Sequence, residues 1–260
     1  MKFFLFVNEV HSARRAAAAG IDVGIVDCES KGKSERQLSG QFEINGDTPE
    51  TALAVESTGL ALCVRVNALG PHTQGEIDTA VSCGASTLML PMSRSSSDVE
   101  VFVDMVAGRA AVLVQIETAE LLADVDRLAS VAWDHAHVGL NDLMLSRGCG
   151  TIWDSLADGT VEQICAALAG RSYGFGGLTV VDGGSPIPAH LVISEMVTLG
   201  CSMGILRRSF KADIAGRSID WEVERLRRFI LAAARRSPTK AAEDRAELYA
   251  MISELAPARP

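Results

Sequence analysis

Short apolar runs, each stopped by a polar or glycine-containing stretch, recur along this chain at intervals suited to alternating strands and helices. Runs rich in Val, Ile and Leu are typical of parallel strands that are buried on both faces. The predicted strands are residues 3–8, 23–27, 62–66, 87–90, 112–116, 137–140, 173–181 and 201–206. Helical patterns such as residues 48–57 and 119–131 lie between them. This alternation predicts an α/β fold, a single (β/α)8 or TIM barrel over residues 1–210.

Residues 211–260 follow the predicted barrel and contain two further helical patterns, 221–235 and 241–255. One face of the first pattern is apolar, and it carries Trp221, Val223, Leu226, Phe229, Ile230 and Ala233. Such a face needs an apolar surface, either on the chain's own barrel or on a second subunit. Because homo-oligomers are common, we expect docking on a second subunit, in a dimer-based assembly that could also be a trimer or hexamer.

Composition narrows the class of protein. The chain has 260 residues, of which 48% are hydrophobic and 22% charged, which suits one barrel with a full core. A net charge of −9 argues against a nucleic-acid partner, which requires a basic surface. The six cysteines are scattered without a CxxC pair, which is typical of reduced thiols in a cytoplasmic protein. The N-terminal apolar run is too short for a membrane span, and we expect no membrane partner.

Two of the predicted strands are followed by an acid. Glu117 follows residues 112–116, and Asp142 follows residues 137–140. Carboxyl ends of barrel strands meet at one edge, where enzyme sites are built, so these carboxylates should lie close together. Oxygen ligands with open positions suit Mg²⁺ or Mn²⁺ better than Zn²⁺. The alternative is that Thr118, Asn141 or Asp142 only caps the helix that follows it.

Other candidate site residues lie at the same edge. Arg65 interrupts an apolar strand, and a buried guanidinium needs either a structural carboxylate or a substrate carboxylate as its partner. Glu29 stands in the polar loop after residues 23–27, where catalysis and simple solvation are both open. The remaining candidates, expected to bind substrate, are Pro91, Gly176, Gly177 and Arg207. Glycines allow close approach to the backbone, while Arg207 would meet a carboxylate or phosphate unless it lies at a solvated edge or interface.

Five motifs at the strand ends fall in a recognisable order. They are VDCE (26–29), VRVN (64–67), LMLPM (88–92), VQIET (114–118) and GLNDL (139–143). Together they resemble the hydroxy-oxo-acid aldolase and citrate lyase β-subunit family, which includes the HpcH/HpaI aldolases of the phosphoenolpyruvate-binding barrel superfamily. The resemblance implies a barrel in which Glu117 and Asp142 hold Mg²⁺ or Mn²⁺ and Arg65 contacts the oxygens of the bound acid. It also implies a last helix that is often exchanged between subunits.

One position departs from the pattern of that family. Its aldolase branch has a proton-transferring His directly after the acid of the first motif, where this chain has Ser30. Its lyase branch has an acidic pair there, of which this chain keeps only Glu29. Proton transfer would then fall to Glu29, Lys31, Lys33 or a metal-bound water. For the histidines, including His135 and His137, we expect structural or surface roles.

The sequence therefore predicts a divalent-metal-dependent carbon–carbon lyase or aldolase that acts on a 2-oxo acid such as pyruvate or oxaloacetate. A 2-oxo acid can chelate through its keto and carboxylate oxygens, and the metal stabilises the enolate that forms when a C–C bond breaks. One alternative is a citrate-lyase-like enzyme that acts on a hydroxyacyl-CoA thioester. Another is a catalytically quiet barrel that binds a metal and an acid. Each reading implies a small carboxylic acid as the ligand.

Overall fold

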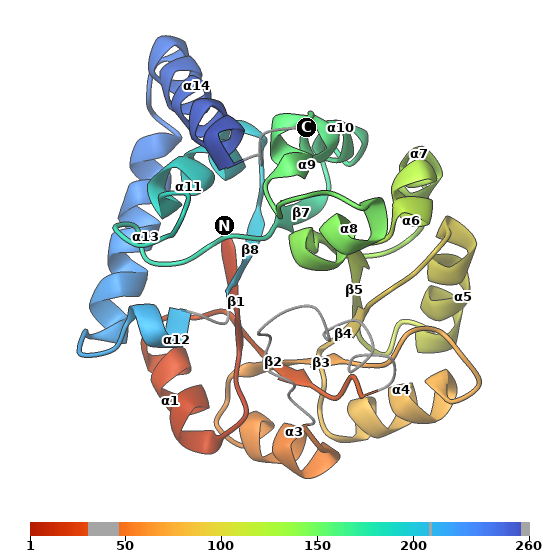
Figure 1. The fold of residues 1–260 in the computed structure, drawn as a ribbon. Coiled ribbons are helices and arrows are strands. Elements are labelled where there is room, and N and C mark those ends of the chain that lie inside the picture. Colours follow the sequence, from red (N-terminus) through yellow and green to blue (C-terminus); the bar gives the residue numbers. More distant parts are fainter. Residues whose placement is uncertain (31–46, 208–209, 256–260) are drawn as a thin grey trace.

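The chain folds into a ring of parallel strands surrounded by helices (Figure 1), in a computed structural model that describes residues 1–30, 47–207 and 210–255. The described residues form one sheet in the order β7-β6-β5-β4-β3-β2-β1-β8. Its strands are β1 (Lys2–Phe6), β2 (Val23–Asp27), β3 (Ala61–Arg65), β4 (Thr87–Leu90), β5 (Ala111–Ile116), β6 (His135–Val138), β7 (Ser172–Phe175) and β8 (Met203–Leu206). The predicted (β/α)8 barrel is confirmed.

Helices follow the strands on the outside of the barrel. They are α1 (Val10–Ala18), α3 (Pro49–Glu56), α4 (Thr73–Ser82), α5 (Ser96–Val106), α6 (Ala119–Ala123), α7 (Val125–Leu128), α8 (Leu140–Arg147), α9 (Asp154–Ala157), α10 (Thr160–Ala167), α11 (Ala189–Thr198), α12 (Phe210–Asp213), α13 (Ile219–Ala233) and α14 (Pro238–Leu255). Across the described ranges, no helix has both the length and the apolar character that crossing a membrane requires.

The barrel closes at an irregular seam between β7 and β8. Ser202 donates its N–H to the carbonyl of Tyr173 at 3.0 Å, and Arg207 donates its N–H to the carbonyl of Leu178 at 2.9 Å. Between these two bonds the strands approach so closely that a Cβ on Gly174 would lie 2.1 Å from the carbonyl oxygen of Met203. Glycine at position 174 is therefore a steric requirement of closure.

Two apolar layers hold the barrel together. The inner layer fills the interior and consists of Phe4, Val23, Ile25, Cys63, Met89, Leu113, Met203 and Ile205. The outer layer lies between the strands and the helices, and Phe102 of α5 and Ile77 of α4 are fully buried in it. Successive side chains of a strand point to opposite faces, so strands such as β2 and β3 contribute apolar side chains to both layers, whereas β6 turns His135 toward Phe4 of the inner layer.

Among the predicted boundaries that differ from the structure are those of β7, of the helix over residues 119–131 and of β6. β7 ends at Phe175, before Gly176 and Gly177, and only Leu178 continues as a single bridge to Leu206. The helical pattern over residues 119–131 forms two short helices that break at Asp124, whose carboxylate accepts the N–H of Ser96 at 2.7 Å. β6 begins earlier than predicted, at His135, and Gly139 directly precedes α8.

The C-terminal helices α13 and α14 pack beside α11 of the same chain (Figure 1). Val223 and Leu226 of the apolar stripe are buried, and Arg245 of α14 bonds both carboxylate oxygens of Glu195 in α11, at 3.1 and 2.6 Å. The sequence predicts docking of this apolar face on a second subunit, whereas the chain itself buries Val223 and Leu226. Trp221 remains 54% exposed, and the homo-oligomer remains a prediction.

We predict that Gly174→Ala lowers the free energy of unfolding by roughly 1–3 kcal/mol or more, because the new methyl group must push β7 away from β8. Gly75→Ala is the matched control: Gly75 lies in α4 with nothing within 4 Å of an added Cβ. That change should raise stability by about 0.5–1 kcal/mol through helix propensity. Denaturant unfolding of both variants measures the effects, and equal stabilities would contradict the steric account of the seam.

Candidate active site

Arg65 lies at the centre of the carboxyl edge of the barrel, where its partners are carboxylates and an amide. Asp27 of β2 and Arg65 of β3 are register partners, so their side chains emerge side by side. The guanidinium donates two bonds to Asp27, from Nε at 2.9 Å and from Nη2 at 2.8 Å. Its Nη1 donates to Oε1 of Gln115 at 3.2 Å, and Nη2 lies 3.4 Å from Oε2 of Glu29. Planar bidentate pairing fixes the orientation of the guanidinium.

This arrangement answers the question that the sequence left open for Arg65. Burial by itself would lower the pKa of Arg65, but the hydrogen bonds and charge of Asp27, with the charges of Glu29 and Glu117, raise it above its usual value. The residue is therefore a permanent cation with a structural carboxylate partner in Asp27. It also lies beside Glu29 and within electrostatic reach of Glu117, so its charge acts on the whole edge of the barrel.

Glu117 directly follows β5, and Asp142, in the first turn of α8 after β6, lies within electrostatic reach of it. Glu117 is 2% exposed, and its Oε1 accepts the N–H of Met92 at 2.9 Å. A Cβ on Gly139 would lie 2.5 Å from its Oε2, so the glycine makes room for the carboxylate. Burial raises the pKa of Glu117 to about 8, with a further contribution from the negative charge of Asp142, against the opposing charge of Arg65.

Of the three residues that could have capped a helix, only Thr118 does so. Thr118 caps α6, and its side chain accepts the N–H of Leu121 at 3.2 Å. At α8 the cap position belongs to Gly139, so Asn141 and Asp142 lie in the first helical turn and do not cap it. Asp142 is thus placed by the first turn of a helix and directed at the same edge as Glu117.

The donor set of this edge is compatible with a hard cation but incomplete by itself. Among residues 1–30, 47–207 and 210–255, no group of three or more His, Cys, Asp or Glu side chains could hold a metal ion. The pair Glu117 and Asp142 supplies two carboxylates, and the negative charge of Asp142 adds to burial in raising the pKa of Glu117. Oxygen atoms of a ligand or of water would have to complete such a site.

The other predicted residues follow further strands, and Pro91 directly precedes Met92, whose N–H bonds Glu117. Pro91 is buried directly after β4. A Cβ on Gly177 would meet Val192 at 3.0 Å and Trp153 at 3.1 Å, so the close approach there comes from the chain itself. Arg207 follows β8, and its Nη2 lies 3.2 Å from Oδ2 of Asp213. Lys31 and Lys33 lie outside the described residues.

The sequence predicts no role for Asp27 or Gln115 and a structural or surface role for His137, and the structure places all three around Arg65. Asp27 was visible as the acid inside the VDCE motif, and Gln115 as the polar residue inside VQIET. Both lie inside strands, where a polar residue in an apolar run signals a partner on the neighbouring strand. His137 is buried at the same level of the barrel, where Gln115 is its register partner.

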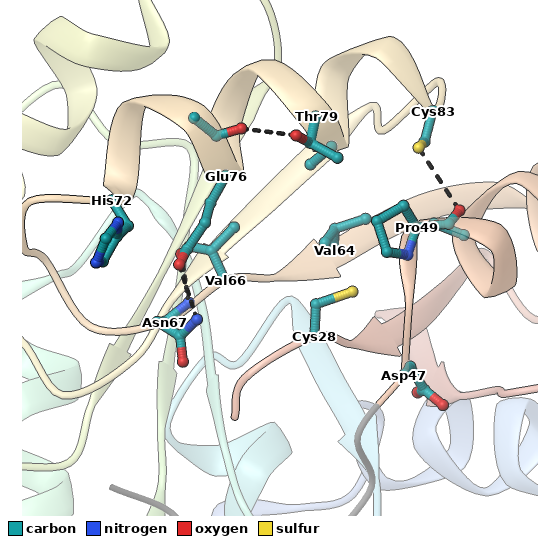
Figure 2. Close-up of a pocket in the computed structure, with 13 residues that line it drawn as sticks. Cys28, Asp47, Pro49, Val64, Val66, Asn67, His72, Glu76, Thr79 and Cys83 are labelled. Atoms are coloured by element: carbon teal, nitrogen blue, oxygen red, sulfur yellow. Dashed lines mark hydrogen bonds between the residues drawn. The ribbon is translucent and has the colours of Figure 1, made fainter. Parts of the chain in front are cut away.

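A separate cavity of about 440 Å³ lies outside the barrel wall, beside β3 and between α3 and α4 (Figure 2). At one end Glu76 accepts the backbone N–H of Asn67 at 3.1 Å and its side-chain Nδ2–H at 2.9 Å. Asn67 in turn accepts the N–H of Ser30 at 2.9 Å. The cavity therefore does not form the barrel mouth, but its wall holds the loop that carries Glu29.

Comparisons with known proteins agree with this fold. A family model described as HpcH/HpaI aldolase/citrate lyase matches residues 1–156. Similar solved structures include an HpcH/HpaI aldolase from Desulfitobacterium hafniense DCB-2, with 16% identity, a TM-score of 0.62, and 83% of this chain and 90% of that chain covered. An HpcH/HpaI aldolase/citrate lyase family protein from Burkholderia cenocepacia J2315 has 18% identity and a TM-score of 0.60, with 89% and 93% covered.

The citrate synthase SbnG is also similar, with 20% identity, a TM-score of 0.60, and 83% of this chain and 92% of that chain covered. At these identities the solved structures show a shared fold alone. Among curated proteins, none matches this chain.

We predict that Glu117→Gln gains stability relative to the wild-type protein as the pH rises. The pKa of Glu117 is about 8 in the folded chain, against an ordinary value of 4.5. The folded chain therefore keeps a proton that the unfolded chain releases, and this carboxyl's contribution to stability falls between about pH 4.5 and pH 8. Gln removes the titration, so in the presence of a chelator the difference in Tm should grow by several degrees from pH 5 to pH 8.

The matched control for this experiment is Glu247→Gln, because Glu247 is exposed on α14. Its difference in Tm from the wild-type protein should stay constant over the same range. A Glu117→Gln variant with an equally constant difference would show that Glu117 is ionised in the folded chain.

Proposed function

Because the chain belongs to the HpcH/HpaI aldolase/citrate lyase family, we propose that it is a divalent-metal-dependent carbon–carbon lyase or aldolase acting on a 2-oxo acid. The observation that supports this proposal most directly is the pairing of Glu117 with Asp142 at the edge where Arg65 carries its charge. Two carboxylates and one fixed cation at a single barrel edge suit a bound metal and an acidic ligand. Pyruvate or oxaloacetate is the substrate class that this combination favours.

Glu117 and Asp142 would hold the metal, which we propose to be Mg²⁺ or Mn²⁺ because both donors are carboxylate oxygens. When bound, the metal would supply Lewis-acid stabilisation of negative charge on the oxygens of the substrate. The chain itself prepares the site for a cation. Burial and the negative charge of Asp142 make the ionised form of Glu117 unfavourable, and a bound cation would relieve both effects.

Arg65 would place a second positive charge beside the bound acid. Its bidentate bond to Asp27 and its bond to Gln115 hold the guanidinium in one plane before the substrate arrives, and such preorganised charge stabilises a developing anion most effectively. Glu29 is the carboxylate proposed for proton transfer, since Ser30 stands where the aldolase branch has its His. Glu29 is 2% exposed and lies next to Arg65.

The first test measures Mn²⁺ binding and oxaloacetate decarboxylation on protein that has been stripped with a chelator and then supplied with Mn²⁺. We expect decarboxylation by the wild-type protein, and loss of both properties in Asp142→Asn, because removing one charge weakens a two-carboxylate site directly. Asp126→Asn is the control, since Asp126 is exposed on α7. Unchanged Mn²⁺ affinity in Asp142→Asn would remove Asp142 from the site.

The same assay separates the proposal from its alternatives. Activity on hydroxyacyl-CoA thioesters but not on free 2-oxo acids would favour the citrate-lyase-like reading. Mn²⁺ binding without turnover of either class would favour a barrel that binds a metal and an acid only.

The second test is Arg65→Lys. An ammonium group cannot hold two oxygens in one fixed plane, so we expect turnover to fall about 30- to 1000-fold, equivalent to roughly 2–4 kcal/mol in the transition state. The Tm should also fall, because one bond to Asp27 is lost. Metal affinity should be nearly unchanged. A lowered Tm with normal turnover would assign Arg65 a purely structural role.

A further inference from the structure

His137 of β6 points into the barrel, close to the candidate active site. Two residues earlier on the same strand, His135 packs edge-on against Phe4 of the inner layer, with ring centroids 5.9 Å apart. Side chains two apart on a strand share a face, so His137 also faces the interior, nearer the carboxyl edge. Its side chain is almost fully enclosed, and the residue is 6% exposed.

The imidazole of His137 makes no hydrogen bond of good geometry with the residues that the structure describes. Both ring nitrogens are buried, and the one backbone group that interacts with the ring is the carbonyl of Phe175, as a weak acceptor. His135 differs, because its Nδ1 lies 2.8 Å from Oγ of Ser172. A buried polar group without a good partner is destabilising, and such groups in native structures commonly serve function or bind something further.

The neighbours of His137 connect it to Arg65. Its register partner on β5 is Gln115, whose Oε1 accepts the bond from Nη1 of Arg65 at 3.2 Å. Its register partner on β7 is Gly174, so that strand presents no side chain beside the ring. The imidazole thus lies next to the Arg65–Gln115 pair, within electrostatic reach of the guanidinium.

The charge state of His137 suits a hydrogen-bonding role. Burial lowers the pKa of His137 to about 4, and the positive charge of Arg65 acts in the same direction. The ring is therefore neutral at pH 7, with one N–H donor and one acceptor nitrogen. A neutral donor can pair with an oxygen of an anion without adding a second buried cation beside Arg65.

We propose that His137 is a ligand-binding residue of this site, which donates a hydrogen bond from its ring to an oxygen of the bound 2-oxo acid. The inference rests on the proposed function, since it requires that the site bind such an acid. His137 lies within β6, before the GLNDL motif at the end of that strand, so this contact would come from the interior of the barrel. It also gives the site a means of selection, because a ligand with an apolar group at that position would leave the imidazole unpaired.

The test compares His137→Phe with the matched control His135→Phe. Tm, Mn²⁺ affinity and the affinity for oxalate, a stable two-carbon diacid, are measured by calorimetry on Mn²⁺-loaded protein. We expect His137→Phe to keep or raise the Tm, because an unpaired polar group is replaced by an apolar one. Mn²⁺ affinity should be unchanged, while oxalate affinity and kcat/KM for oxaloacetate fall tenfold or more. His135→Phe should leave oxalate affinity unchanged, and His137→Gln should restore part of it.

Equal oxalate affinity in the wild-type protein and in His137→Phe would overturn the inference and leave the proposed function intact. A wild-type protein that neither binds oxalate nor turns over oxaloacetate would overturn both. If His137→Phe does not fold, the inference is tested instead by NMR of the wild-type protein, through the imidazole ¹⁵N resonances of His137. They should shift when oxalate is added, and unshifted resonances at saturating oxalate would overturn the inference.

Discussion

The buried ion pair between Arg65 and Asp27 is the interaction around which the carboxyl edge of this barrel is built. It joins β2 to β3 at the point where the two strands end, and both partners lie almost wholly out of solvent. Removing two charges from water is costly, so the pair is tolerable only because its geometry is bidentate and further groups accept from the guanidinium. Gln115 and Glu29 are those groups, and their positions therefore depend on Arg65.

Most of the fold could be predicted because a barrel repeats one local pattern. Strands such as residues 23–27 and 87–90 have the predicted bounds, since an apolar run buried on both faces has no alternative environment. α3 begins after Thr48, as its capping residues indicate. The seam at Gly174 and the packing of α13 and α14 on α11 could not be predicted, because each depends on surfaces far apart in sequence.

The residues of the candidate site also fall into those that the sequence could predict and those that it could not. Glu117 and Asp142 could be found from sequence, because each directly follows an apolar run that ends at the shared edge of the barrel. Asp27 and His137 could not, because a polar residue within a strand acquires its role from the register of the neighbouring strand. Asp27 meets Arg65 only through the β2–β3 register, and His137 meets Gln115 only through the β5–β6 register.

Gly139 limits how this site can vary among related chains. A carboxylate oxygen of Glu117 occupies the place where any larger residue at position 139 would put its Cβ. The two positions therefore form one steric unit, although they belong to successive strand ends. A larger residue at position 139 therefore requires the carboxylate of Glu117 to move away or to be replaced.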